Sequence, residues 1–233
     1  MNVAVVVFPG SNADFDALHA ARDVLGADTR RVFHKEESLG NADAVIIPGG
    51  FAHGDYLRCG AIARFSPIAK AITEFAERGG PVIGICNGFQ ILTEMHLLPG
   101  ALTRNAHLRF ECGDIYVRTE ARGAFTTGIS EGKVLRLPIA HAEGRYQCDA
   151  ATLALLEKDA RIAFRYCDES GNVEGFTPKS KSMANIAGIY NEKRNVLGLM
   201  PHPERACEKI LGNDDGFLLF ASLREHLRHG GTQ

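Results

Sequence analysis

Three residues from two distant stretches have types and spacing that suit nucleophilic catalysis, namely Cys86, His202 and Glu204. Cys86 follows a short apolar run and precedes apolar residues at helical spacing, so it lies at a predicted strand-to-helix turn. A nucleophile in such a turn projects above the carboxyl edge of a sheet and needs small residues two positions away, where Gly84 and Gly88 stand. The pattern predicts a nucleophilic thiol. A buried core cysteine between turn glycines is the alternative, because free cysteines are often buried.

A cysteine nucleophile needs a base, because a thiol with a pKa of about 8.5 is mostly uncharged at pH 7. His202 is the best candidate, since it follows the apolar segment 195–200 and would reach the same edge of the sheet. Glu204 lies two positions further, where an extended chain points side chains the same way, and it would hold the imidazole in one tautomer. The alternative is a solvated His-Pro-Glu surface turn, and only the combination with Cys86 favours catalysis.

Attack on a carbonyl also requires N–H donors for the developing oxyanion. Asn87, directly after Cys86, provides one backbone N–H at the predicted turn. Gly49 and Gly50 follow another apolar strand and bring a second peptide close, because neither has a Cβ. Pro-Gly-Gly is also a common end of a strand, so this motif carries little weight alone.

Strands and helices alternate along the first hundred residues in a way that would position these groups. Apolar runs predict strands at 2–8, 43–47 and 82–85, each ending in a turn that contains glycine. Predicted helices follow at 11–25, opened by a cap from Ser11 and Asp14, at 66–79, opened by Ser66-Pro67, and at 87–96. Such a pattern predicts a parallel sheet covered on both faces, with ligands at the carboxyl ends of its strands.

The texture changes after residue 107 to shorter segments that predict antiparallel strands. They lie at 115–118, 134–137, 162–166 and 186–190, and are followed by an apolar strand at 195–200 and a helix at 216–229. The predicted fold class is α/β and flavodoxin-like, with a mostly parallel central sheet flanked by helices and an antiparallel extension. A chain of 233 residues is within the range of one domain, which we expect to span 1–233.

Composition narrows the classes of partner and compartment. A formal net charge of -2 and the lack of a basic block argue against nucleic acid as a partner. The longest apolar run, Val3 to Pro9, is too short for a membrane span and lacks the basic start of a signal peptide, which predicts a cytoplasmic protein. Six widely spaced cysteines without a C-x-x-C pair predict neither a disulfide framework nor a metal site.

Longer motifs make a specific resemblance visible. G-x-C-x-G-x-Q at 84–90 and His-Pro-Glu at 202–204 are similar to the class I glutamine amidotransferases, which use a Cys-His-Glu triad. Within that class, three stretches resemble the small glutaminase subunits of phosphoribosylformylglycinamidine synthase, an enzyme of purine biosynthesis: PGGFAHGDYLRCGAIARFSPI at 48–68, GICNGFQ at 84–90 and MPHPER at 200–205. The resemblance spans the whole chain.

The resemblance implies a role for each matching residue. Its triad would consist of the nucleophile Cys86, the acid/base His202 and the orienting Glu204. The other residues that the resemblance assigns to substrate binding are the oxyanion donors Gly50 and Asn87 and the glutamine contact Gln90.

The implied reaction is hydrolysis of glutamine to glutamate and ammonia through a cysteinyl thioester. The chain has no G-x-x-x-x-G-K-[ST] loop and no convincing G-x-G-x-x-G, so no cofactor is expected in it. ATP and Mg are expected on the partner, a large synthetase subunit that acts on formylglycinamide ribonucleotide, often with a small accessory subunit.

Further residues resemble family segments near the glutamine pocket or a subunit contact, and structural capping explains them about as well. They are Asn105, Phe110, His141 and Glu143, and the segment 177–182 is a predicted mobile loop. Three other readings stay open: another class I amidotransferase subunit, a Cys-His hydrolase or peptidase of the same fold, and a binding module without activity.

Overall fold

A computed structural model describes residues 1–230, which carry one large sheet with helices packed against it. The first half of the sheet is parallel in the order β2-β1-β3-β4-β11. Its strands are β1 (Asn2–Val7), β2 (Asp28–Phe33), β3 (Ala44–Ile47), β4 (Val82–Ile85) and β11 (Val196–Leu199). This is the flavodoxin-like strand order, so the predicted fold class is confirmed.

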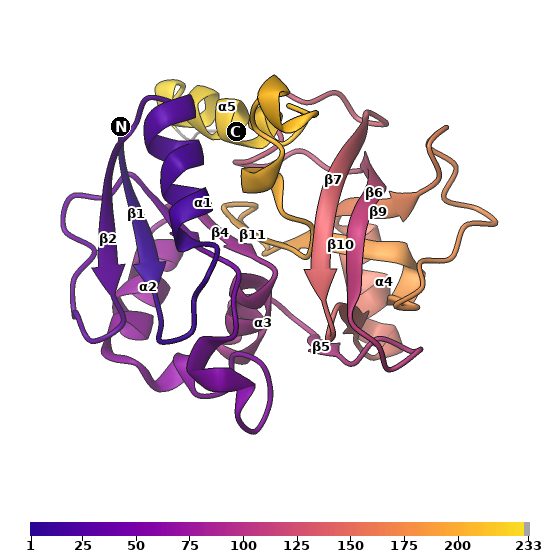
Figure 1. Cartoon of the computed structure of the whole chain (residues 1–233), viewed down its shortest axis with the longest axis horizontal. Helices are drawn as coiled ribbons and strands as arrows, with labels where there is room; N and C mark the ends of the chain where they lie inside the picture. The colour runs from indigo at the N-terminus through magenta and orange to yellow at the C-terminus, as the bar shows by residue number, and fades with distance from the viewer. Residues whose placement is uncertain (231–233) are drawn as a thin grey trace.

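The second half of the sheet continues from β11 with antiparallel neighbours in the order β10-β9-β6-β7. These strands are β6 (Glu111–Thr119), β7 (Val134–His141), β9 (Ile162–Cys167) and β10 (Ile186–Tyr190), while β5 (Ala101–Thr103) and β8 (Arg145–Gln147) pair separately. Figure 1 shows the parallel strands β1 and β2 and the antiparallel strands β6 and β7 on opposite sides of the molecule. The predicted antiparallel extension is therefore confirmed.

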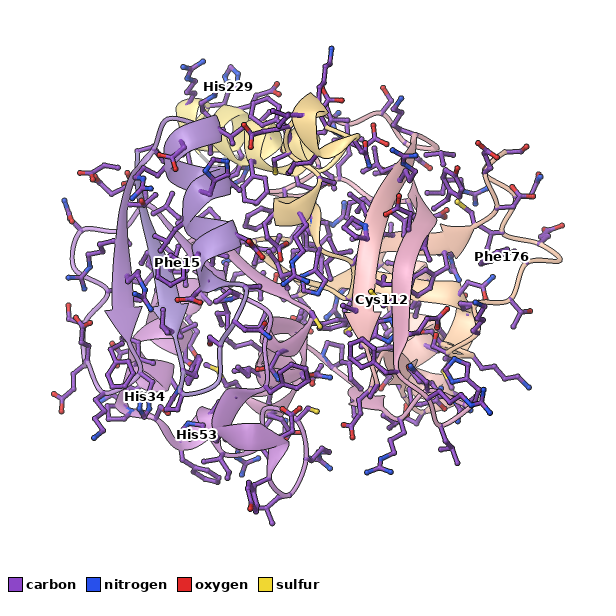
Figure 2. The ribbon with its side chains drawn as sticks, in the orientation of Figure 1. Phe15, His34, His53, Cys112, Phe176 and His229 are labelled. Atoms are coloured by element: carbon purple, nitrogen blue, oxygen red, sulfur yellow. The ribbon has the colours of Figure 1, made fainter. Side chains whose placement is uncertain are left out.

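The helices are α1 (Asp14–His19), α2 (Pro67–Glu77), α3 (Asn87–Glu94), α4 (Ala150–Lys158) and α5 (Phe217–Arg228). Every residue of β3, β4 and β11 is buried, as expected for Val- and Ile-rich strands covered on both faces. Strand β7 instead alternates between buried and partly exposed residues, which is typical of a sheet with one solvated face, and Cys112 on the neighbouring strand is exposed (Figure 2). The core therefore lies around the central parallel strands. No helix within residues 1–230 is both long and apolar enough to cross a membrane.

Several local predictions differ from the structure. Ser11 does not cap a helix: α1 begins at Asp14 without a side-chain cap, and the Ser11 hydroxyl accepts a hydrogen bond from the backbone N–H of Phe8 at 3.1 Å. The short loop uses Ser11 to reverse the chain, so its hydroxyl is not available to the helix. The helical path continues as a π-helix over Ala20–Val24, which preserves the predicted end near Leu25.

Four elements were not predicted. Strand β2 (DTRRVF) is mostly polar and exposed, and the pairing with β1 defines it better than its own pattern does. Leu156 is the only buried residue of helix α4, so the helix has no strong apolar periodicity. Strands β5 and β8 have three residues each, which is too short for a periodic signal. The last three residues of the predicted domain 1–233 lie outside the described part of the chain.

Candidate active site

Cys86 occupies the turn between β4 and α3, and its backbone conformation is unusual. Its φ of 52° and ψ of -105° are strained for a residue with a side chain, and such strain typically costs about 1–3 kcal/mol. The turn is held from both sides, because the N–H of Cys86 donates to the carbonyl of Leu199 at 2.8 Å and its own carbonyl accepts from the N–H of Phe89 at 3.0 Å. The thiol is therefore fixed at the carboxyl edge of the sheet, as the sequence predicts.

The glycines that flank Cys86 are required by close packing. A Cβ on Gly88 would lie 2.0 Å from the carbonyl oxygen of Ile47, and one on Gly84 would lie 2.5 Å from the carbonyl oxygen of Gly88. Helix α3 thus approaches the ends of β3 and β4 more closely than any side chain would permit. This contact brings the start of α3 beside the turn that follows β3.

His202 and Glu204 come from the segment that follows β11, the parallel neighbour of β4. The Nδ1 of His202 and the Oε1 of Glu204 are 2.6 Å apart, and both residues are 2% exposed. Burial disfavours a charged imidazole, but Glu204 and Cys86 outweigh it, so the pKa of His202 is raised above its ordinary value. The other ring nitrogen, Nε2, has no hydrogen-bond partner within residues 1–230 and is the one left for Cys86.

The turn after β3 packs directly on this pair. A Cβ on Gly49 would lie 2.7 Å from the Cε1 of His202 and 3.4 Å from the Cβ of Cys86. The carbonyl of Gly49 accepts from the backbone N–H groups of Asn12 at 3.3 Å and Ala13 at 3.2 Å. Because N–H and C=O point in opposite directions across a trans peptide, the N–H of Gly50 points away from these donors.

Both predicted oxyanion donors have free N–H groups. Within the described residues, the backbone N–H of Gly50 and that of Asn87 donate to no protein acceptor. Gly50 has a φ of 152°, and a Cβ there would lie 2.6 Å from the Cα of Ser11, so only glycine fits. The structure thus has two unused donors near Cys86, one on the turn after β3 and one directly after Cys86 at the start of α3.

Gln90 is 5% exposed and lies one helical turn after Cys86. Its Nε2 donates to the carbonyl of Glu143 at 2.8 Å, and its Oε1 accepts from the Nδ2 of Asn87 at 2.8 Å. The sequence predicts a role for the backbone N–H of Asn87 but not for this side chain. The only signal available was an amide residue at a position otherwise surrounded by small and apolar residues.

Asn105 and His141 form a buried brace. The Oδ1 of Asn105 accepts from the N–H of Gly144 at 3.0 Å and lies 3.1 Å from the Nδ1 of His141, while its Nδ2 donates to the carbonyl of His141 at 2.9 Å. Burial, together with nearby His202, lowers the pKa of His141 to about 4. Asn105 therefore acts as a local cap for residues 141–144, whereas Phe110 is 52% exposed and lies outside the brace.

Comparison with known proteins decides between the remaining readings of this site. Residues 1–215 match the family described as the CobB/CobQ-like glutamine amidotransferase domain. The chain belongs to the glutamine amidotransferase family. It is 53% identical over 224 residues to the phosphoribosylformylglycinamidine synthase subunit PurQ of Salinibacter ruber, covering 96% of this chain and 95% of the relative.

Two further amidotransferase relatives extend this result. The PurQ subunit of Methanosarcina mazei is 50% identical over 228 residues, covering 97% of this chain and 98% of the relative. The solved structure described as PurLQS from Thermotoga maritima superposes with a TM-score of 0.85 at 40% identity, covering 97% and 98% of the two chains. The chain therefore belongs to the PurQ group of the glutamine amidotransferases.

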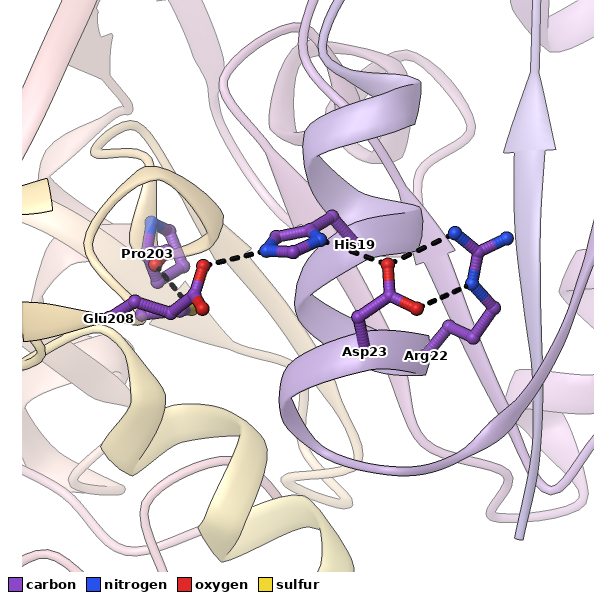
Figure 3. Close-up of polar contacts among 6 residues, drawn as sticks. His19, Arg22, Asp23, Pro203 and Glu208 are labelled. Atoms are coloured by element: carbon purple, nitrogen blue, oxygen red, sulfur yellow. Dashed lines mark hydrogen bonds and ion pairs between the residues drawn. The ribbon is translucent and has the colours of Figure 1, made fainter. Parts of the chain in front are cut away.

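A polar cluster joins α1 to Glu208, four residues after the amidotransferase triad residue Glu204 (Figure 3). The Nε2 of His19 is 2.6 Å from the Oε2 of Glu208, and its Nδ1 is 2.9 Å from the Oδ2 of Asp23. Hydrogen bonds to both carboxylates raise the pKa of His19. Within residues 1–230, no group of three or more His, Cys, Asp or Glu side chains is arranged to hold a metal ion.

Proposed function

We propose that this chain is the glutaminase subunit of a phosphoribosylformylglycinamidine synthase and forms one catalytic domain. Its site would hydrolyse glutamine and release ammonia for the synthetase subunit. The observation that carries the proposal is the convergence of Cys86, His202 and Glu204 at one sheet edge in a chain that belongs to the PurQ group.

The reaction begins with attack of the Cys86 thiolate on the side-chain amide carbon of glutamine. The raised pKa of His202 supports an imidazolium beside this thiolate. The C=O π electrons move to oxygen, and the free N–H groups of Gly50 and Asn87 stabilise the oxyanion. As the carbonyl reforms, the C–N bond breaks and His202 donates its proton to the departing nitrogen. The nitrogen leaves as ammonia, and the γ-glutamyl group remains on Cys86 as a thioester.

Hydrolysis of the thioester returns the site to its starting state. Neutral His202 accepts a proton from water, and the resulting hydroxide attacks the thioester carbon. The C–S bond then breaks, which releases glutamate and regenerates the Cys86 thiolate beside the His202 imidazolium. Glu204 holds the imidazole through the 2.6 Å contact to Nδ1 in both steps, so that Nε2 stays directed at the reacting atoms.

Gln90 is proposed to contact the bound glutamine. Its Nε2 uses one hydrogen for the carbonyl of Glu143, which leaves the second hydrogen of that amide for a substrate oxygen. The burial of Gln90 supports this role, because a buried amide with an unused donor favours a polar ligand.

The ammonia acceptor is proposed to lie on a partner. PurQ relatives carry the name of a synthase subunit, and the PurLQS structure is that of an assembly. We expect a large ATP- and Mg-using synthetase subunit that activates formylglycinamide ribonucleotide, together with a small accessory subunit. The expected compartment is the cytoplasm, where the other steps of nucleotide synthesis would share the substrates.

A glutamine-like diazo-ketone tests the proposed nucleophile in the assembled complex. The reagent is expected to label Cys86 stoichiometrically, to abolish glutamine-dependent synthesis and to leave ammonium-dependent synthesis intact. Peptide mass spectrometry locates the label, and saturating glutamine should protect against it. Labelling of Cys59 or Cys207 in place of Cys86, with equal loss of activity, would refute the assignment.

A further inference from the structure

A chain of buried hydrogen bonds connects three segments of the site through the side chain of Asn87. The Oδ1 of Asn87 accepts from the backbone N–H of Ala52 at 3.1 Å, two residues after Gly50. Its Nδ2 donates to the Oε1 of Gln90 at 2.8 Å, and the Nε2 of Gln90 donates to the carbonyl of Glu143 at 2.8 Å. These three hydrogen bonds therefore join the turn after β3, the start of α3 and the segment that follows β7.

The direction of every hydrogen bond in this chain is fixed by its two ends. The N–H of Ala52 is only a donor, and the carbonyl of Glu143 is only an acceptor. Gln90 must therefore present its amide nitrogen to Glu143 and its oxygen to Asn87, which forces the Asn87 nitrogen toward Gln90. An uncharged amide accepts on one side and donates on the other, whereas an ionised carboxylate of the same size only accepts.

The position of Ala52 makes the chain relevant to the oxyanion. Both peptides that flank Gly50 are tethered, since the carbonyl of Gly49 accepts from Asn12 and Ala13 and the N–H of Phe51 donates to Gly10 at 2.9 Å. Those tethers run to the loop after β1. The bond from Ala52 to Asn87 ties the same turn to the first residue of α3, directly after the proposed nucleophile Cys86.

We propose that the Asn87 side chain is a positioning residue that holds the Gly50 N–H toward the reacting carbonyl by linking its turn to Gln90. This inference rests on the proposed function, because it assigns Gly50 an oxyanion role. Asn87 then contributes twice: its backbone N–H binds the oxyanion, and its 1% exposed side chain orients the second donor. The same hydrogen bonds, from Ala52 through Asn87 to Gln90, also couple the Gly50 donor to the proposed glutamine contact Gln90.

Substitution of the side chain separates the two contributions, because any residue at 87 keeps the backbone N–H. In the assembled complex, Asn87→Ala is expected to lower the glutaminase kcat by about tenfold or more, up to the roughly 100- to 1,000-fold associated with loss of an oxyanion donor. Alkylation of Cys86 by iodoacetamide should stay at the wild-type rate, since that displacement forms no oxyanion. Co-elution of this chain with the synthetase subunit in size-exclusion chromatography reports whether the complex assembles. If the Asn87→Ala complex does not assemble, Asn87→Ser carries the same prediction.

The isosteric variant Asn87→Asp tests the link to Gln90. Its carboxylate still accepts from Ala52 but has no hydrogen for Gln90, and it also faces Asp55, whose Oδ1 lies 3.5 Å from the Asn87 Nδ2. Protonation restores the donor. The ratio of Asn87→Asp to wild-type kcat is therefore expected to rise as the pH falls from 8 to 5.5.

Asn195 provides a matched control on the opposite edge of the sheet. It is 4% exposed and its Nδ2 donates to the carbonyls of Ala76 and Gly80, both at 2.8 Å. Asn195→Asp loses comparable buried hydrogen bonds and should lower the melting temperature without changing the glutaminase kcat.

Three results would overturn the positioning role. These are a wild-type kcat in Asn87→Ala, a parallel loss of kcat and Cys86 alkylation, and a pH-independent activity ratio for Asn87→Asp. A failure of the proposed function is distinguishable from all three, because it would appear as wild-type protein that is not labelled at Cys86.

Discussion

Two buried histidines near Cys86 show how one carboxylate determines the charge of an imidazole. His202 and His141 are 2% and 3% exposed, so both are removed from water to a similar extent. The pKa of His202 is raised because Glu204 and Cys86 outweigh burial, whereas the pKa of His141 is lowered to about 4 because no carboxylate compensates. At neutral pH the site therefore contains one imidazole suited to proton transfer and one that stays neutral.

The triad assignment predicts unequal losses from its two supporting residues. Glu204→Gln should lower the glutaminase kcat less than His202→Ala, because orienting an imidazole is a smaller task than transferring the proton. Steady-state glutamine hydrolysis by the two complexes provides the comparison. Equal losses of kcat would mean that Glu204 has a different role.

Three turns meet at the carboxyl edge of the parallel strands, and their contact determines the geometry of the site. They follow β3, β4 and β11, which are hydrogen-bonded neighbours in the sheet. Gly49, on the first turn, leaves no room for a side chain, because a Cβ there would meet His202 and Cys86 on the other two turns. The separation of nucleophile and acid/base is therefore set by how closely the first turn packs against them.

Gly49→Ala is predicted to affect catalysis more than folding. The added Cβ would lie 2.7 Å from the Cε1 of His202, so the imidazole must move away from Cys86, and we expect kcat to fall by about tenfold or more. Gly79→Ala is the control: a Cβ there would meet no atom within 4 Å, but φ is 91°, so the variant should lose about 1–2 kcal/mol of stability and retain kcat. The account is contradicted if Gly49→Ala behaves like the control.

The contact between His19 on α1 and Glu208 predicts a pH-dependent contribution to stability. The pKa of His19 is raised in the folded state, so the contribution is complete below the unfolded value of about 6.5 and is lost as the pH rises through the folded value. Because the side chain of His19 is 46% exposed, the pair with Glu208 is worth less than about 1 kcal/mol. Urea unfolding of Glu208→Gln should show a small deficit at pH 5.5 and none at pH 9.5; an equal deficit at both would exclude the ion pair.

The sequence was most informative where local pattern and long-range structure agree. The strand at 82–85, the elbow at Cys86 and the helix opened by Ser66-Pro67 were predicted because apolar runs, glycines and proline act locally. Strand β2 is defined by its pairing with β1. The hydrogen bonds through Asn87 and Gln90 are also long-range, because Ala52 lies 35 positions before Asn87 and Glu143 lies 53 positions after Gln90. Ser11 misled the prediction, because a hydroxyl before a helix also closes a turn.

At the scale of the whole molecule, residues 1–230 carry a complete set of candidate hydrolytic groups, and the acceptor for ammonia is proposed to lie on the synthetase partner. Unrestrained hydrolysis would waste glutamine. The structure holds the Gly49–Gly50 peptide by two long hydrogen bonds of 3.3 and 3.2 Å, and glycine tolerates a rotation of such a peptide. The turn after β3 is therefore suited to have two orientations that a partner could bias.

The isolated chain is predicted to hydrolyse glutamine slowly and to accelerate when the loaded synthetase partner docks. Losing one oxyanion donor lowers rates by about 100- to 1,000-fold, which is enough to keep the free subunit nearly silent. Glutamate formation should be measured with the chain alone, with the partner, and with the partner plus its nucleotide ligands. Equal rates in all three conditions would remove the gating hypothesis and leave the triad assignment untouched.

The most direct test of the central claim is the behaviour of Cys86→Ser in the assembled synthase, with glutamine and with ammonium as nitrogen donors. A serine hydroxyl is a much poorer nucleophile in a site arranged for a thiolate. We predict that glutamine-dependent product formation is abolished while ammonium-dependent formation continues at the wild-type rate. Near-normal glutamine-dependent synthesis by Cys86→Ser would contradict the account, because the chemistry would then not pass through this cysteine.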